Sequence, residues 1–235
     1  MFKLCKSEFI KYFYGKKILS LIACLIGLIV FFTIIILNFK KSHITVSSFM
    51  DSYFNGFLIS PFLPIMLIIL SAQTVALDYT LGCTKFFLIS NLKKQDIIIG
   101  KIIFITLIIL FSLVFSYLTS FAIGCILFKG IHGLNIILKN YIYSIPALYS
   151  LCVFTITIAL VFDNFQNTLM ISIGSYIFML IVDSILPSAN FFTLTAVLSN
   201  VGNITNNFTY MSSVIYSLVF TVASIIIMRK KDVLI

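Results

Sequence analysis

The chain has 235 residues, of which 61% are hydrophobic and only 10% are charged, and its formal net charge is +9. A soluble domain needs a polar surface, so this composition excludes one of any size and indicates a polytopic membrane protein. In such a protein the excess of Lys and Arg is explained by the cytoplasmic bias of basic residues and by anionic lipid headgroups, rather than by nucleic acid.

The first 17 residues form a basic segment that carries five lysines. Phe2, Phe9 and Phe13 lie between these lysines, with Cys5 on the same side, which predicts an amphipathic helix on the inner leaflet. A signal peptide is the alternative. The apolar run at 18–37 is longer than the core of a typical signal peptide and no small-residue cleavage site follows it, so we expect a retained first span.

Six apolar segments are long enough to cross a bilayer. They predict an all-α polytopic membrane protein with one transmembrane domain over residues 1–235. We place the spans at about 18–37, 57–77, 102–128, 141–162, 168–186 and 210–228.

The connecting segments differ in polarity. Residues 38–56 and 129–140 read as polar loops, and residues 163–167 as a tight turn. Residues 188–209 are too apolar for a free loop and too polar for a span, so we expect a re-entrant or interfacial element before the sixth span. Pro146 is expected to kink the fourth span near its start.

An even number of spans places both termini on the same side of the membrane. Twelve of the 16 Lys and Arg residues then lie on that side, against four on the other. This bias predicts that both termini, and the segment 78–101 between the second and third spans, are cytoplasmic.

The segment 78–101 is a charged island between two long apolar runs. Its apolar residues recur at roughly helical spacing, with basic residues between them, which predicts a short amphipathic helix in the interface. A solvated loop that only connects two spans is the alternative. The apolar positions are Phe86, Phe87, Leu88, Leu92 and Ile97.

The same segment resembles the corresponding loop of type-2 ABC permeases, the membrane subunits of one class of exporter. That loop has an acidic residue, then Gly-Thr, a hydrophobic patch, a Pro with a basic pair, and Gly-Lys at the start of the third span. The matching positions here are Asp78-Tyr79, Gly82, Leu88, Lys93-Lys94 and Gly100-Lys101. Cys83 and Asn91 stand where Thr and Pro are usual. The basic cluster with Asp at 229–232 is a further similarity.

The resemblance implies a coupling helix on which a separate cytosolic ATPase docks. We expect Gly82 and Gly100 to turn the chain at the ends of this helix, and Lys101 to cap the third span at the interface. The residues expected to couple to the ATPase are Asp78, Gly82, Lys85, Phe86, Phe87, Leu88, Lys93, Lys94, Gly100 and Lys101.

The chain offers little for covalent chemistry. It has no G-x-x-x-x-G-K-[ST], no H-E-x-x-H and no G-x-S-x-G, so we expect no catalytic site, no metal and no bound cofactor, with ATP and Mg²⁺ on the partner ATPase. The five cysteines show no paired spacing, and we expect them to be small buried residues. Gln73 and Asp183 are polar guests in apolar runs and candidate residues of a substrate path. For Asp183 the alternative is a carboxylate that reaches headgroup water.

These observations favour the permease subunit of an ATP-driven exporter in a bacterial plasma membrane. Two ATPase subunits and a second permease chain, in the simplest case an identical one, would complete the transporter. Similar short permeases export antimicrobial or cytolytic peptides such as phenol-soluble modulins, and drugs such as bacitracin. An amphipathic peptide or hydrophobic small molecule is therefore the expected cargo. The alternative is an ATP-independent membrane protein, such as an immunity or scaffold factor or a small channel.

Overall fold

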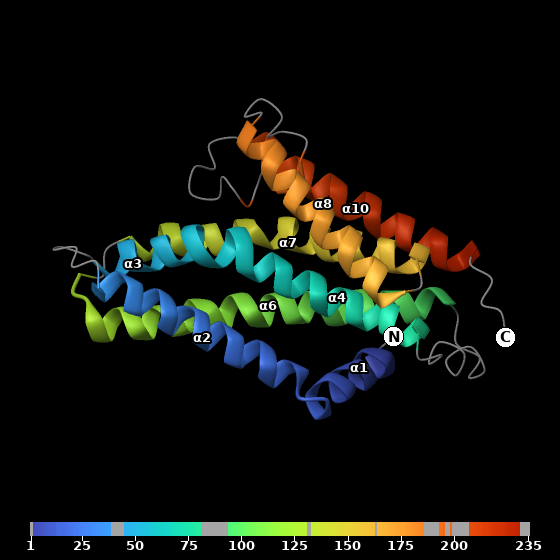
Figure 1. Cartoon of the computed structure of the whole chain (residues 1–235), viewed down its shortest axis with the longest axis horizontal. Helices are drawn as coiled ribbons and strands as arrows, with labels where there is room; N and C mark the ends of the chain where they lie inside the picture. Colours follow the sequence, from blue (N-terminus) through green and yellow to red (C-terminus); the bar gives the residue numbers. More distant parts are fainter. Residues whose placement is uncertain are drawn as a thin grey trace.

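The computed structural model describes residues 2–38, 45–80, 94–130, 133–162, 164–185, 193–195, 198 and 207–230. Within these ranges the chain forms helices joined by short turns (Figure 1). Six of the helical stretches are long and apolar enough to cross a membrane, which confirms the predicted multi-pass helical architecture. They are Lys17–Asn38, Val46–Thr80, Lys94–Leu127, Leu134–Phe162, Phe165–Ile185 and Tyr210–Lys230.

Helix α7 (Leu134–Phe162) is the centre of the bundle. It packs against α4 (Leu63–Thr80), α6 (Lys94–Leu127), α8 (Phe165–Ile185) and α10 (Asn207–Lys230). Figure 1 shows α6 and α7 running along the length of the molecule, with α2 (Lys17–Asn38) on one side and α8 and α10 on the other. The N-terminus, the start of α6 and the end of α10 all lie at one end of the bundle.

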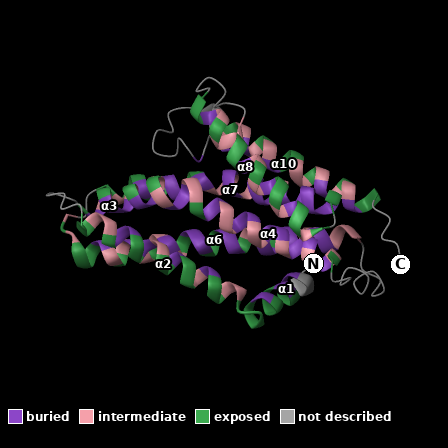
Figure 2. Ribbon diagram, viewed as in Figure 1, coloured by how far each residue is buried: buried purple, intermediate pink, exposed green. Residues whose placement is uncertain are grey.

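The peripheral helices expose their apolar side chains. Figure 2 shows exposed residues along α2, α8 and α10, whereas buried residues concentrate in the middle of the bundle. In water such faces would cost free energy in proportion to their area, but hydrocarbon solvates them. Phe31 on α2, Phe178 on α8 and Val222 on α10 are examples, each about half or more exposed.

The second span begins eleven residues before the predicted one. Residues 46–56, which we expected in a polar loop, continue the helix as α3 (Val46–Tyr53) and the start of η1 (Phe54–Phe62), a π-helical stretch. Thr45 caps α3: its hydroxyl accepts from the Ser48 backbone N–H at 3.3 Å, and the Ser48 hydroxyl accepts from the Thr45 N–H at 3.0 Å. Phe49 and Tyr53 are fully buried. Tertiary burial and this capping box together override the polar composition.

Two prolines explain the irregular stretch in the second span. Pro61 lies inside η1 and Pro64 inside the first turn of α4. Because Pro64 has no N–H, the carbonyl of Ser60 lacks its usual donor four residues later. The hydroxyl of Tyr176 on α8 donates to this carbonyl instead. The π-helical geometry and this contact satisfy backbone groups that hydrocarbon could not.

A stripe of small residues brings α6 close to its neighbours. Ser112, Ser116 and Ser120 are buried, and each hydroxyl donates to a backbone carbonyl three residues earlier. Gly124 continues the stripe at the same four-residue spacing. A Cβ at Gly124 would lie 3.0 Å from a methyl group of Val46. Small residues at this spacing permit close helix contact in membranes.

The other helices also differ from their predicted bounds, mainly by extension. Helix α6 begins at Lys94 rather than 102, and α7 begins at Leu134 rather than 141. The bounds of α8 and α10 agree with prediction to within three residues. The turn before α8 is formed around Asn164, whose side chain accepts from the Gln166 N–H at 3.1 Å. Pro146 lies in the interior of α7.

The basic N-terminal segment is helical, as predicted, over α1 (Phe2–Tyr14). Phe9 and Phe13 are 49% and 64% exposed, whereas Glu8 and Tyr12 are buried. Cys5, expected on the same side as the phenylalanines, is also buried. Hydrophobicity alone could not predict that an acidic residue would be buried against other helices.

The cysteines are not uniformly buried. Cys5 and Cys152 are buried as expected, but Cys24 and Cys125 are exposed on the surface of the bundle. All four are free thiols, and Cys83 lies outside the described residues.

Candidate functional site: a cluster of four charges

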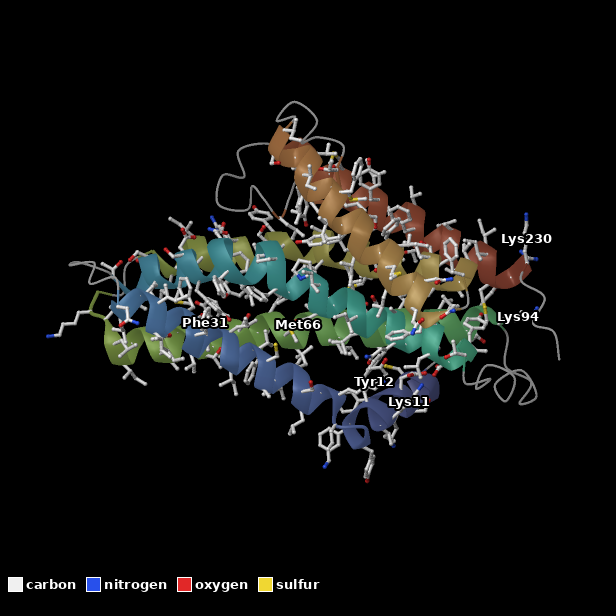
Figure 3. The ribbon with its side chains drawn as sticks, viewed as in Figure 1. Lys11, Tyr12, Phe31, Met66, Lys94 and Lys230 are labelled. Carbon is white, nitrogen blue, oxygen red and sulfur yellow. The ribbon has the colours of Figure 1, made fainter. Side chains whose placement is uncertain are left out.

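Four charged side chains from three helices meet at the end of the bundle that carries the N-terminus. Glu8 and Lys11 come from α1, Asp78 from the last turn of α4, and Lys101 from the second turn of α6. Asp78 is 0% exposed, Lys101 3% and Glu8 4%. Figure 3 shows Lys11 and Tyr12 on the side of α1 that faces the bundle. The cluster therefore fastens α1 to both α4 and α6.

Asp78 is the centre of this cluster. The Lys11 ammonium donates to its Oδ1 and the Lys101 ammonium to its Oδ2, so both carboxylate oxygens are paired. Lys101 also donates to the backbone carbonyl of Thr74, one turn earlier in α4. Two carboxylates and two ammonium groups sum to zero charge. The fully buried Asp78 carboxylate is paired on both oxygens, by the buried Lys101 and by Lys11, whose side chain is 40% exposed. Without such pairing a buried charge would cost several kcal/mol.

Glu8 is the weakly held member of the cluster. Its Oε1 lies 3.7 Å from Lys101 Nζ and its Oε2 lies 3.9 Å from Lys11 Nζ, both beyond hydrogen-bond distance. Among the described residues its Oε2 has no hydrogen-bond partner. Burial raises the pKa of the Glu8 carboxyl above its ordinary value. Lys101 and Lys11 lower this pKa and Asp78 raises it, and burial prevails.

Glu8→Gln is therefore expected to be tolerated and to remove a pH dependence. A carboxyl whose pKa is raised in the folded state contributes stability below its unfolded pKa, and this contribution is lost as pH rises through the folded value. Wild type should thus lose stability relative to Glu8→Gln as pH increases from about 4.5. Thermal unfolding of both proteins in detergent across this range checks the sign. If the stability advantage of Glu8→Gln over wild type became smaller as pH rises, the raised pKa of Glu8 would be contradicted.

Tyr12 supports the attachment of α1. Its ring packs on Phe104 of α6 at a centroid distance of 4.9 Å, and its hydroxyl donates to the Leu70 carbonyl of α4 at 3.4 Å. The ammonium of Lys17, at the start of α2, lies 4.7 Å from the ring centroid. A cation at this distance over an aromatic face is an attractive contact. The N-terminal helix is thus held by charge, by aromatic packing and by a hydrogen bond.

The structure brings together two of the residues predicted at the coupling segment, Asp78 and Lys101. Two expectations about this segment are wrong. Gly100 is buried inside α6 and makes no turn, and Lys101 faces Asp78 rather than the membrane interface. Ile97, assigned to the amphipathic helix, is likewise a buried residue of α6. These errors share one cause, since α6 starts before the charged residues end.

The remaining predicted coupling residues fall mostly outside the described part of the chain. Lys94 is the first residue of α6 and is half-buried. Six predicted positions lie in 81–93, which the structure does not describe: Gly82, Lys85, Phe86, Phe87, Leu88 and Lys93.

Sequence reasoning missed Glu8 and treated Lys11 as a headgroup contact. One signal was available: Glu8 is one of only seven acidic residues in the chain and the only one in the basic N-terminal segment. Its spacing of three residues from Lys11 also permits an ion pair on one helix face. The contact of Lys11 with Asp78 and that of Glu8 with Lys101 join residues far apart in the sequence, so neither has a local signature.

The two candidate path residues lie in different surroundings. Gln73 is half-buried in α4 and lines a hollow of about 270 Å³ together with Lys17 and Ser20. Asp183 is 8% exposed near the end of α8, and the hydroxyls of Thr193 and Thr195 donate to its two carboxylate oxygens. Leu194 and Leu198 are buried nearby in sequence, so the described part of 188–209 packs into the protein. Most of that segment lies outside the described residues.

Replacing Asp183 is expected to loosen the segment that follows α8. Asp183→Leu removes both acceptors and leaves two threonine hydroxyls without them, a cost of about 1–3 kcal/mol for each buried group. Asp183→Asn keeps one acceptor oxygen and should cost less. Thermal unfolding in detergent, with Ser184→Ala on the exposed side as control, measures the difference. Equal stability of Asp183→Leu and wild type would show that these two hydrogen bonds do not contribute to the stability of the fold.

The fold defines a multi-pass helical membrane protein, and the cluster of four charges ties the ends of two of its spans to an N-terminal helix. No protein-family model matches this sequence, and no curated protein matches it either.

Proposed function

We propose that this chain is the membrane-embedded permease subunit of an ATP-driven exporter. A separate cytosolic ATPase would bind the segment 78–101 and drive the spans between inward-facing and outward-facing states. The observation that carries the proposal is the Asp78–Lys101 ion pair, which joins the two helices that enter and leave this segment. Such a rigid connection between α4 and α6 is needed if the ATPase is to move the spans, because a flexible connection would not transmit the movement. We call the Asp78–Lys101 contact the joint between α4 and α6.

The neighbours of α4 and α6 supply a route for that movement. Helix α4 packs on α7 and α8, and α6 packs on α1, α3 and α7. A displacement applied at the end of α4 and the start of α6 would pass first to these neighbours. Because Asp78 also pairs with Lys11, α1 would move with the same joint. Packed helices transmit such shifts as rigid bodies.

The residues that resemble type-2 ABC permeases supply the other part of the proposal. Asp78 and Lys101, which stand at the two ends of the matching pattern, are the pair that meets in the structure. The chain contains no P-loop, so ATP and Mg²⁺ would bind to the partner, two copies of which would serve two permease chains. A homodimer in a bacterial plasma membrane, with both termini cytoplasmic, is the simplest assembly consistent with the charge bias.

The cargo class follows from the character of the spans. Charged residues are scarce within them, so a small inorganic ion would find few ligands. An amphipathic peptide or a hydrophobic small molecule is better matched to apolar surfaces between helices, and it is the proposed substrate class.

Purification of the tagged full chain from its native membrane in mild detergent tests this function. The expected result is a stoichiometric complex with a P-loop ATPase that hydrolyses ATP. Replacing an acid far from the charge cluster should not affect this result. Asp51→Asn, near the opposite end of the bundle, should therefore purify with the same partner. Isolation of the folded chain without any ATP-binding protein would contradict the proposal and favour an ATP-independent membrane protein.

A further inference from the structure

Two hollows flank the start of α2, and Lys17 lines both of them. The first, of about 230 Å³, lies between α1, α2 and α6 and reaches Leu107 and Phe111. The second, of about 270 Å³, lies between α2 and α4 and reaches Met66. They also share Leu21 and Leu70. The first hollow is lined almost entirely by apolar side chains, the second also by Ser20 and Gln73, and Lys17 is the cation common to both.

We call the side of the two hollows at Lys17 their mouth. Lys17 is the first residue of the first span, so the mouth lies at the boundary of the membrane. Ser20 and Gln73 line the second hollow near this mouth, whereas Met66 is seven residues from Gln73, about 10 Å along the helix. In the first hollow, Phe111 lies ten residues beyond Lys101, about 15 Å further along α6.

The positive charge of Lys17 at the mouth favours an anionic ligand. The four-charge cluster beside it is neutral as a whole, so Lys17 and the exposed Lys16 add uncompensated positive charge at this position. Lys17 is held over the Tyr12 ring rather than extended into solvent. A single cationic mouth above two apolar grooves complements an anionic headgroup that carries two acyl chains.

We propose that an anionic diacyl phospholipid binds here, with its phosphate at Lys17 and one acyl chain in each hollow. Tyr12 lines the first hollow and sits in α1 one turn from Glu8. Bound lipid therefore braces α1 and α2 against α4 and α6, and it stabilises the buried charge cluster. This inference depends on the membrane fold and stands whether or not an ATPase binds the chain.

The test uses the purified, delipidated full chain in detergent, titrated with phosphatidylglycerol or with phosphatidylcholine. Thermal unfolding and native mass spectrometry report binding. We expect phosphatidylglycerol to raise the unfolding temperature more than phosphatidylcholine. Lys17→Gln should weaken the phosphatidylglycerol response by at least about tenfold in Kd. Lys17→Arg should keep it, and so should Lys139→Gln, which removes an exposed lysine from the opposite end of the bundle.

A second pair of variants tests the acyl groove without changing charge. Ile22 lines the first hollow, whereas Ile26 lies one turn later on α2, is 44% exposed and lines neither. Ile22→Trp should fill the groove and lower the affinity for phosphatidylglycerol, and Ile26→Trp should not. Each variant is compared with its own lipid-free baseline, so a general loss of stability does not count as lost binding.

Two results would overturn the proposal. If wild type and Lys17→Gln were stabilised equally by phosphatidylglycerol and by phosphatidylcholine, the lipid would act only as a general solvent of the apolar surface. Stabilisation by an amphipathic cationic peptide, with no response to phosphatidylglycerol, would assign the two hollows to a transported cargo instead.

Discussion

Lys101→Met is expected to destabilise the protein by about 3–5 kcal/mol, because it leaves Asp78 and Glu8 as two buried carboxylates with only Lys11 to neutralise them. Asp78→Asn is expected to cost a similar amount, since Lys101 then keeps its charge at 3% exposure and loses its short contact. Thermal unfolding in detergent measures both losses.

The double variant distinguishes the loss of the ion pair from the effect of changing each side chain alone. Asp78→Asn with Lys101→Met leaves Glu8 and Lys11 as a neutral pair, so its loss of stability should be well below the sum of the two single losses. Asp96→Asn, a half-buried acid in the first turn of α6, is the control and should cost less than about 1 kcal/mol. Single variants as stable as wild type would show that the cluster does not hold α4 to α6.

If the proposed function is correct, Phe86→Ala with Phe87→Ala is expected to uncouple the chain from its ATPase while insertion and the proposed dimer are retained. Aromatic side chains in desolvated pockets dominate the energy of protein interfaces, and these two are the only aromatic pair in 81–93. Binding of the ATPase, or its hydrolysis stimulated by cargo, should fall at least about tenfold, which corresponds to about 1.4 kcal/mol.

The lysines of the same segment should act differently. Lys85, Lys93 and Lys94 are expected to steer docking or to hold the inner leaflet at about 1 kcal/mol each, so neutralising one should mainly change salt dependence. A matched control for the aromatic pair is Phe31→Ala with Phe178→Ala, which removes two exposed rings from the outer faces of α2 and α8. If the Phe86/Phe87 variant retains full ATPase association and export, this segment is only a topological connection.

The number and order of the spans could be predicted because hydrocarbon imposes a simple rule on each segment. A run of about 20 apolar residues must form a helix that satisfies its own backbone. The ends of the helices could not be predicted in this way. Val46 to Tyr53 read as part of a loop, and Lys94 to Lys101 as part of a separate interfacial segment. Both belong to spanning helices because other helices bury one side of each.

The charge cluster shows a similar division. The family resemblance indicates Asp78 and Lys101, and the composition indicates Lys11 only as one of five N-terminal lysines. The contacts among them depend on how α1 packs against α4 and α6. Glu8 carries only two local signals, its acidity within a basic helix and its spacing of three residues from Lys11. The burial of Cys5 away from Phe9 and Phe13 also depends on how α1 packs against other helices.

The N-terminal helix gains a specific role in this account. If it were only an anchor on the membrane surface, its removal from the bundle would leave the joint between α4 and α6 unchanged. The pairing of Lys11 with Asp78 indicates instead that α1 supplies one of the two cations that neutralise the central carboxylate. Movement of α1, whether driven by an ATPase or by bound lipid, would therefore alter the joint itself.

Photo-crosslinking from position 87 in intact cells tests the central claim most directly. With benzoylphenylalanine in place of Phe87, we predict an adduct that contains a P-loop ATPase, whereas the same group in place of the exposed Phe178 of α8 should give none. Adducts at position 87 that contain lipid but no ATPase would contradict the account.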